Sequence, residues 1–400
     1  MASATQDQIL LATMPDVRPL ASILKSLSFR NQATLKVDAK GLRFTVEEGR
    51  GLQAHAYINS TSFSTYNFSL APTDPAAVTD DAGASPPASP SSSPGAEDPP
   101  ANLYCHTSIS LATMLECLNI FGNAGVSSGA AGGAGGGGKC DRGRRESTFA
   151  EGEEEGYGYG GRRRQVGRGG EDEEAEVMQP KEKTSLRISY KALGEPLVLL
   201  LEESGIVTRC ELTTYEPEGL LDLAFPDDDR VVRLIMKSEW LRDALLELPA
   251  SSEKVSISFA PPHLVDRGRG AAKRLRRVDS MRFEQEEDDE GEGEEEEVPL
   301  FRLESTGIMG STEMDYSDDR DVLEVFECNQ PLRNSYKFSH IQLTKQALNA
   351  SIKTSIRTAP SGLVSFQFMI PLGRGGRSSG VQEEKVGFVE FLCIALDEDY

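Results

Sequence analysis

The stretch DVRPLASILKSLSF, residues 16–29, carries the pattern that decides the fold. Its apolar residues recur every three or four positions, which predicts an amphipathic helix with one buried stripe. The same offsets return in SISLATMLECLNIF (residues 108–121) and KSEWLRDALLEL (237–248), and more weakly in HIQLTKQALNA (340–350). Four such segments indicate an internal repeat. The residues of the four stripes are Leu20, Ile23, Leu24 and Leu27; Leu111, Met114, Leu115 and Leu118; Leu241, Ala244, Leu245 and Leu248; and Leu343, Ala347 and Ala350.

Segments that alternate between apolar and polar residues surround each predicted helix. After the first helix come ATLKVDA, GLRFTVEE and LQAHAYIN, and similar segments follow the other three. Alternation with a period of two predicts half-buried antiparallel strands. The order strand, helix, three strands therefore repeats four times. This pattern predicts an α+β fold of two similar domains, each with two helices packed on one face of antiparallel sheet.

Three segments of biased composition interrupt this repeating frame. Residues 71–101 are rich in Pro, Ser and Ala, residues 122–183 in Gly and then in charge, and residues 261–297 end in an acidic tract. We expect all three to be disordered insertions, because such compositions bury too little apolar surface to fold. The frame then divides into an N-terminal domain (1–214), a connector with the sequence YEPEGLL (215–221) and a C-terminal domain (222–400).

The formal net charge of −22 at first argues against a nucleic-acid partner. However, residues 284–297 alone hold eleven carboxylates, so much of the charge lies in insertions rather than in the frame. The sequence has no apolar run long enough to cross a membrane and no signal-peptide pattern, which predicts a soluble intracellular protein without a membrane partner. The six scattered cysteines show no metal-ligand spacing, and no cofactor motif occurs in a suitable context.

Some cations fall on the predicted exposed faces of the helices. With the first stripe buried, the helical period places Arg18 and Lys25 on the opposite side. Lys345 projects in the same sense from the fourth helix, and Arg242 lies on the flank of the third. We predict these four residues as DNA-facing, since exposed cations on a helix can contact a phosphate backbone without reading sequence.

The frame resembles a known family. MPDVRPLASILKSLSFRNQATLKVDAKGLRFTVEEGRGLQAHAYI, PLVLLLEESGIVTRCEL and KSEWLRDALLEL, with LECLNIFG, CNQPLRNSYKFS and the segments KTSIRT, GLVSFQFMI and FVEF, are similar to the Rad-one (Rec-one) family of checkpoint clamp subunits. That family belongs to the sliding-clamp superfamily of proliferating cell nuclear antigen. The similarity covers nearly all of the frame, in order, and none of the insertions.

The resemblance implies a DNA-clamp fold whose helices line a central hole and whose sheets form the rim. It further implies a non-catalytic subunit of the heterotrimeric nine-one-one ring, with Rad-nine and Hus-one partners, a dedicated clamp loader and duplex DNA bound without sequence preference. The family's rings close by pairing of edge strands, and its partner peptides dock near the connector. Carried over, the groove residues are Leu42, Tyr215 and Leu221. The edge-strand residues are Ile206, Val207, Thr208, Arg209, Cys210, Glu211 and Leu212, and Ile308, Met309, Gly310, Ser311, Thr312, Glu313 and Met314.

Two other readings stay open. A 3′→5′ exonuclease needs carboxylates converging on two metal ions, whereas the densest carboxylates here lie in one low-complexity tract. A free adaptor that recruits kinases through its insertions is the third hypothesis. A nuclear location is predicted, because the basic run Lys273, Arg274, Arg276 and Arg277 resembles a nuclear-localisation patch; a solvated basic loop is the alternative reading.

Overall fold

The computed structural model describes most of the repeating frame. The described residues are 8–70, 78–79, 103–122, 183–221, 223–225, 230–262, 299–307, 310–316, 319–374 and 384–397. They belong to one compact unit, formed by Met1–Ser128 and Lys183–Tyr400. The three predicted insertions lie almost entirely outside these ranges. What is described is rich in strands and contains few helices.

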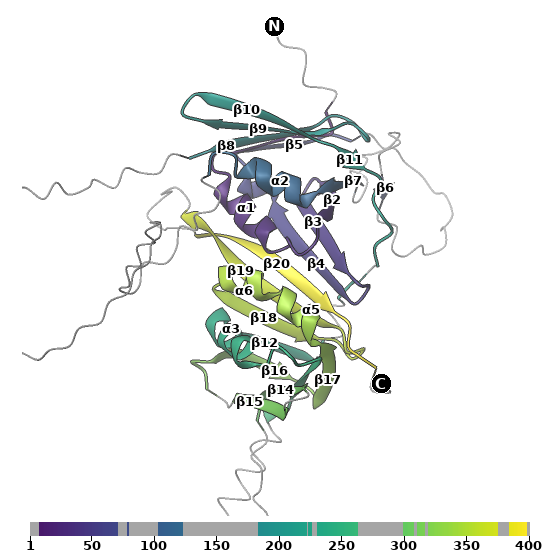
Figure 1. Cartoon of the computed structure of the whole chain (residues 1–400), viewed down its shortest axis with the longest axis vertical. Coiled ribbons are helices and arrows are strands. Elements are labelled where there is room, and N and C mark those ends of the chain that lie inside the picture. The colour runs from purple at the N-terminus through teal and green to yellow at the C-terminus, as the bar shows by residue number, and fades with distance from the viewer. Residues whose placement is uncertain are drawn as a thin grey trace, which may run out of the picture. The chain divides into compact units, whose positions relative to one another are not determined.

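A central sheet joins the first and second halves of the chain (Figure 1). Its strand order is β11-β7-β2-β3-β4-β20-β19-β18-β12-β16, with β6 paired to β7, and its strand pairs are antiparallel. The two halves meet where β4 pairs with β20. The strands are β2 (Gln32–Asp38), β3 (Gly41–Glu48), β4 (Leu52–Asn59), β6 (Val78–Thr79), β7 (Leu103–Ser110), β11 (Thr214–Tyr215), β12 (Val232–Lys237), β16 (Leu323–Cys328), β18 (Lys353–Thr358), β19 (Val364–Arg374) and β20 (Glu384–Cys393).

Two smaller antiparallel sheets complete the strand structure. One has the order β10-β9-β8-β1-β5 and comes from the first half of the chain; the other has the order β15-β14-β13-β17 and comes from the second. A short 3-10 helix, η1 (Ser60–Ser62), precedes β5. The strands are β1 (Leu10–Met14), β5 (Thr65–Phe68), β8 (Ser185–Tyr190), β9 (Leu197–Glu203), β10 (Ile206–Leu212), β13 (Lys254–Phe259), β14 (Phe301–Gly307), β15 (Gly310–Tyr316) and β17 (Leu332–Lys337).

The helices form where the apolar stripes predict them. They are α1 (Arg18–Lys25), α2 (Leu111–Leu118), α3 (Ser238–Glu247), α5 (Phe338–Leu343) and α6 (Lys345–Ala350). The predicted stripe residues of the first and third segments are all buried, and those of the second are buried except for half-buried Leu115. Burial of one face on a sheet stabilises such short helices, which would be marginal in isolation.

Each helix contacts a sheet, and the helices also neighbour one another. Helix α1 packs on β4, β19 and β20, α2 on β2 and β7, α3 on β12 and β18, and α6 on β19. Contacts also join α1 to α2 and to α6, and α3 to α6. Figure 1 shows these helices on the same side of the central sheet. The approach of α1 is close, because a Cβ atom at Gly387 of β20 would lie 2.4 Å from the Cδ1 atom of Ile23.

The fourth helical segment differs from its expected form. Instead of one helix, α5 and α6 meet at Thr344, whose hydroxyl donates a hydrogen bond to the main-chain oxygen of Ile341. Such back-bonding by threonine competes with the helical ladder and bends helices. The buried stripe also shifts: Ala347 is buried as expected, whereas Leu343 and Ala350 are only half-buried. Their places in the core are taken by Phe338, Ile341 and Leu348.

Candidate assembly edges, connector and helix surface

Strands β10 and β15 are edge strands of the two smaller sheets. Within the described residues, β10 pairs with β9 and β15 pairs with β14, and each leaves its other side open. An open strand side exposes unpaired main-chain donors and acceptors, which another strand can satisfy. Strand β10 coincides with the edge residues predicted from the sequence. Strand β15 begins at Gly310, and the predicted residues Ile308 and Met309 lie outside the described residues.

The β10 edge is bordered by α2. At its start, Ile206 and Val207 are each 61% exposed, so two neighbouring β-branched apolar side chains lie at the surface. Farther along, Cys210 lies within hydrogen-bonding reach of Cys117 of α2; burial and this neighbouring thiol raise the pKa of Cys117 to about 11. The exposed pair Arg209 and Glu211 projects from the other face of the strand.

The connector is held on the outer face of the central sheet, the face opposite the helices. The main-chain N–H of Leu221 donates to the carboxylate of Glu47 on β3 at 2.9 Å. Its main-chain oxygen accepts from the side-chain amide of Gln53 on β4 at 2.6 Å. At the other end, the hydroxyl of Thr107 on β7 donates to the main-chain oxygen of Tyr215 at 3.1 Å. The connector is therefore fixed to three strands of the first half.

Beneath and beyond the connector, polar side chains of the outer face are buried. Glu390 of β20 accepts hydrogen bonds from Arg357 of β18 at 2.9 Å and from Ser365 of β19 at 2.7 Å. The side chains of Arg357 and Glu390 are only 13% and 12% exposed. The guanidinium of Arg357 also lies 4.7 Å from the ring centre of Phe225, four residues after Leu221. This network stabilises the seam where β4 and β20 join the two halves, because each buried charge has a partner.

The predicted groove residues have different surroundings. Leu42 is 3% exposed, which corrects the expectation that it lines a surface groove, because its side chain is part of the core. Tyr215 is 51% exposed and Leu221 is half-buried, so both lie where a partner could reach them. Alternation alone could not reveal the anchors Glu47 and Gln53, since it predicts exposed polar residues at both positions. Only the path of the connector over the sheet buries Gln53 to 2% exposure.

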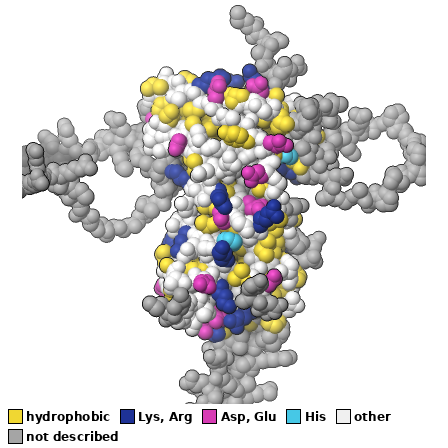
Figure 2. Space-filling view, turned by 45° about the vertical axis from the view of Figure 1, so that its right-hand side comes forward, with side chains coloured by type: hydrophobic (Ala, Val, Ile, Leu, Met, Phe, Trp, Pro, Cys, Tyr) yellow, Lys and Arg dark blue, Asp and Glu magenta, His cyan; other side chains and the backbone are white. Residues whose placement is uncertain are grey.

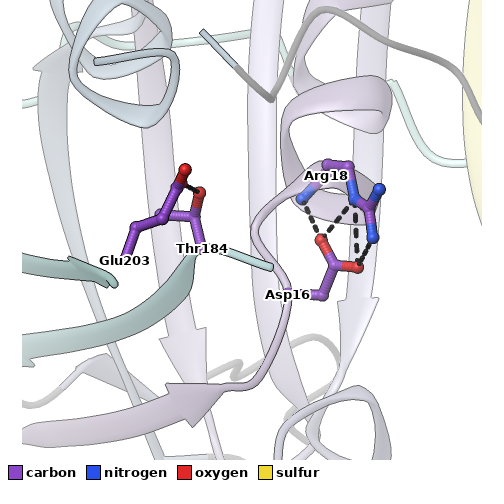
Figure 3. Close-up of polar contacts among 4 residues, drawn as sticks. All are labelled: Asp16, Arg18, Thr184 and Glu203. Atoms are coloured by element: carbon purple, nitrogen blue, oxygen red, sulfur yellow. Dashed lines mark hydrogen bonds and ion pairs between the residues drawn. The ribbon is translucent and has the colours of Figure 1, made fainter. Parts of the chain in front are cut away.

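Arg18 does not present an unpaired cation. Figure 3 shows its guanidinium turned back onto the carboxylate of Asp16, with an Nε to Oδ1 distance of 2.9 Å. Burial raises the pKa of Asp16, but hydrogen bonds from Arg18 and the charges of Arg18 and Lys183 outweigh it and leave that pKa below its usual value. Near this pair, Thr184 donates to the carboxylate of Glu203 (Figure 3). Arg18 therefore fixes the start of α1, and its charge is already balanced within the chain.

The other predicted DNA-facing cations also lie on helices. Arg242 forms an exposed ion pair with Asp243 of the same helix at 3.3 Å. Lys25 and Lys345 are half-buried on α1 and α6. Figure 2 shows basic side chains interspersed with acidic ones over the face it presents. Of the four predicted cations, two are therefore paired with a neighbouring carboxylate and two are half-buried.

Several sequence predictions concern residues that the structure leaves undescribed. The basic run Lys273, Arg274, Arg276 and Arg277 lies outside the described residues, as does the acidic tract. Within the described ranges, no three His, Cys, Asp or Glu side chains are grouped to hold a metal ion. None of the helices described there has the length and apolar character needed to cross a bilayer.

Comparison with known proteins identifies the family. A family described as repair protein Rad1/Rec1/Rad17 matches residues 9–370. The chain belongs to the Rad1/Rec1/Rad17 family. The match includes both edge strands, the connector and all the helices described above.

Curated relatives of the Rad1/Rec1/Rad17 family match over most of their length. The human cell cycle checkpoint protein RAD1 is 27% identical over 389 residues, which cover 97% of this chain and 92% of the relative. The DNA repair exonuclease REC1 of Mycosarcoma maydis is 28% identical over 460 residues, and the match covers 97% of this chain and 96% of the relative. The DNA damage checkpoint control protein rad1 of Schizosaccharomyces pombe is 24% identical over 382 residues, and the match covers 95% of this chain and 84% of the relative.

Proposed function

We propose that this protein is a non-catalytic subunit of a heterotrimeric DNA-damage checkpoint clamp, which encircles DNA and scaffolds signalling and repair factors in the nucleus. The checkpoint role follows from the relatives named for DNA damage and cell cycle checkpoints. In this proposal the chain has a two-domain clamp fold, and its partners are two related subunits of the Rad-nine and Hus-one types, with a clamp loader and duplex DNA.

One observation supports assembly most directly: within the described residues, β10 and β15 each end one of the two smaller sheets and leave one side unpaired, with β5 and β17 at the opposite ends. The two edges come from different halves of the chain and have different sequences. Two unlike edges on one subunit fit head-to-tail joining, which closes into a ring when the rotation permits. Helices on the opposite side of the central sheet from the connector then face the opening, and the outer face with its anchored connector remains free for partners.

The mass of the assembly under native conditions tests this proposal. The full chain is co-expressed with the Rad-nine-type and Hus-one-type subunits of the same organism and purified through a tag on one partner. We expect one copy of each subunit in the complex. Once the clamp loader has placed it, the complex should stay on nicked circular DNA and slide off after the circle is cut. A stable homotrimer of this chain that encircles DNA by itself would contradict the heterotrimer.

A second candidate function, exonuclease activity, comes from the name of the Mycosarcoma maydis relative. It predicts magnesium-dependent release of nucleotides from the 3′ ends of DNA by the purified full chain. That activity has to disappear when carboxylates of the folded frame are replaced, and to survive neutralisation of the tract at residues 284–297. Activity that follows a contaminant through purification, unaffected by both sets of replacements, would reject the enzyme.

A further inference from the structure

One flank of α3 borders the open edge of β15. The hydroxyl of Tyr316, at the end of β15, donates to the main-chain oxygen of Trp240 at 3.4 Å. Burial and the nearby charges of Glu247 and Asp243 raise the pKa of Tyr316 to about 12, which places both carboxylates beside the same hydroxyl. Trp240, Asp243 and Glu247 are three to four residues apart, so they share one helix face. Strand β15 and this flank form a continuous surface, which we call the β15 surface.

An exposed indole lies on this surface. Trp240 is the only tryptophan in the chain and is 40% exposed. Tryptophan is enriched among the residues that dominate protein–protein binding energy, because its large ring fills a pocket with little loss of conformational freedom. Leu246 of the same helix is 66% exposed, but it lies about 120° around the helix from Trp240.

Carboxylates lie on both sides of the β15 edge. Asp243 and Glu247 border it on the side of α3, and Glu313 and Asp315 project from the opposite face of the strand. Arg302 on β14 reaches Glu313 at 3.2 Å and Asp315 at 2.6 Å. Arg302 thus pairs with two carboxylates, and Arg242 of α3 pairs with Asp243 at 3.3 Å. With two arginines beside four carboxylates, the β15 surface keeps a net negative charge around Trp240.

We propose that the β15 surface selects its partner subunit: Trp240 enters an apolar pocket beside a related subunit's edge strand, and the carboxylates pair with basic residues around that pocket. The inference rests on the proposed function and adds the chemistry of one interface. A hydrophobic anchor surrounded by complementary charges supplies affinity through the anchor and selectivity through the charges.

The β10 edge does not offer this chemistry. The flank of α2 beside β10 carries Glu116 and no basic residue, since α2 has the sequence LATMLECL. On β10 itself, Arg209 is already paired with Glu211 at 2.6 Å. Pairing β15 of one copy with β10 of a second copy would therefore bring Glu116 toward Asp243 and Glu247. Like charges brought together at an interface disfavour that pairing, so the β15 surface discriminates against a second copy of this chain.

Pairwise binding of the full chain to each related subunit tests the inference. We expect Trp240→Ala to weaken binding to one of the Rad-nine-type and Hus-one-type subunits by about 30-fold or more, and to leave binding to the other unchanged. Leu246→Ala is the matched control on the same helix, and we expect it to change neither affinity. Asp243→Lys with Glu247→Lys should weaken the same complex as Trp240→Ala, with a loss that shrinks as salt is raised.

An edge variant separates failure of this inference from failure of the proposed function. Thr312→Pro and Ser311→Pro each remove one main-chain N–H donor from β15. Because the N–H groups of neighbouring strand residues point to opposite sides, one of the two variants leaves the hydrogen bonds with β14 intact. If the folded proline variant abolishes one pairwise complex and Trp240→Ala does not affect it, the anchor is rejected and the ring stands. If both proline variants fold and keep both complexes, β15 is not an assembly edge and this inference is rejected. The proposed function fails if the unsubstituted full chain binds neither related subunit.

Discussion

The seam between the two halves and the open β10 edge differ in the burial of their ion pairs. At the seam, the ion pair of Arg357 and Glu390 is nearly buried and shares hydrogen bonds with β19. At the β10 edge, the ion pair of Arg209 and Glu211 is more than half exposed on its arginine side, at 59% and 50%. A buried network fixes one arrangement of strands, whereas exposed pairs can exchange partners at small cost. The contrast marks the strand pairing at the seam as fixed; in the proposed ring, the β10 edge is left for assembly.

Among the changes considered, we expect removal of the Glu390 carboxylate to have the largest effect on stability. We expect Glu390→Ala to lower the free energy of unfolding by about 3–5 kcal/mol, because it leaves the charge of Arg357 buried without its carboxylate. Urea unfolding of the purified chain measures the change. Glu211→Ala, at the exposed pair, is the matched control and should cost less than about 1 kcal/mol. Equal losses for the two variants would show that the seam network has no special stabilising role.

The neighbouring His55 gives the seam a dependence on pH. Burial, together with the charge of Arg43, lowers the pKa of His55 to about 3 from 6.5. The folded state binds a proton on His55 less readily than the unfolded state does. The free energy of unfolding is therefore highest, as far as His55 is concerned, above pH 6.5, and it decreases as the pH falls toward 3. We expect a loss of about 2 kcal/mol between pH 7 and pH 5 from this residue. His55→Asn should flatten that part of the stability curve measured by urea unfolding; an unchanged slope would exclude His55 as its source.

The connector anchor should have a smaller, local effect. Glu47→Ala removes the acceptor of the Leu221 N–H, and we expect a loss of about 1.5 kcal/mol in the protection of that amide. Hydrogen exchange resolved to the connector measures it. Glu48→Ala is a neighbouring control, because Glu48 pairs with exposed Arg30 instead. Faster exchange of Leu221 in both variants would mean that general loosening of β3, and not the anchor, is responsible.

The helix surface is expected to give the smallest change. Lys25→Glu tests whether α1 contacts DNA. For the assembled ring, we expect the salt dependence of binding to duplex DNA to fall by about one phosphate contact, without a change in sequence preference. Lys254→Glu, on β13 rather than on a helix, serves as the control. The same loss from Lys254→Glu would argue against a DNA-facing helix surface.

Periodicity predicted much of the fold, and it failed where a single side chain altered a helix or a loop crossed a sheet. The stripes of α1 and α3 are buried as predicted because a strict spacing of three and four leaves one possible inward face. The break at Thr344 depends on the hydrogen bond from its hydroxyl to the main-chain oxygen of Ile341, which the spacing of apolar residues does not predict. Periodicity does not single out Trp240 as a surface residue for a related reason. In the sequence it is one more apolar residue of a helix, and only the tertiary structure places it beside Tyr316 of β15.

By itself, the sequence determined the helices, the alternating strands, the positions of the biased segments and the family, because these depend on the order of neighbouring residues along the chain. Only the tertiary structure decided that β4 joins β20, that the connector crosses Gln53, and that Arg18 is neutralised by Asp16. Those outcomes depend on distances between residues far apart in sequence, or on the choice of one side-chain rotamer. Hydrophobic pattern fixes which face is buried; the burial of individual charges is settled by what covers them.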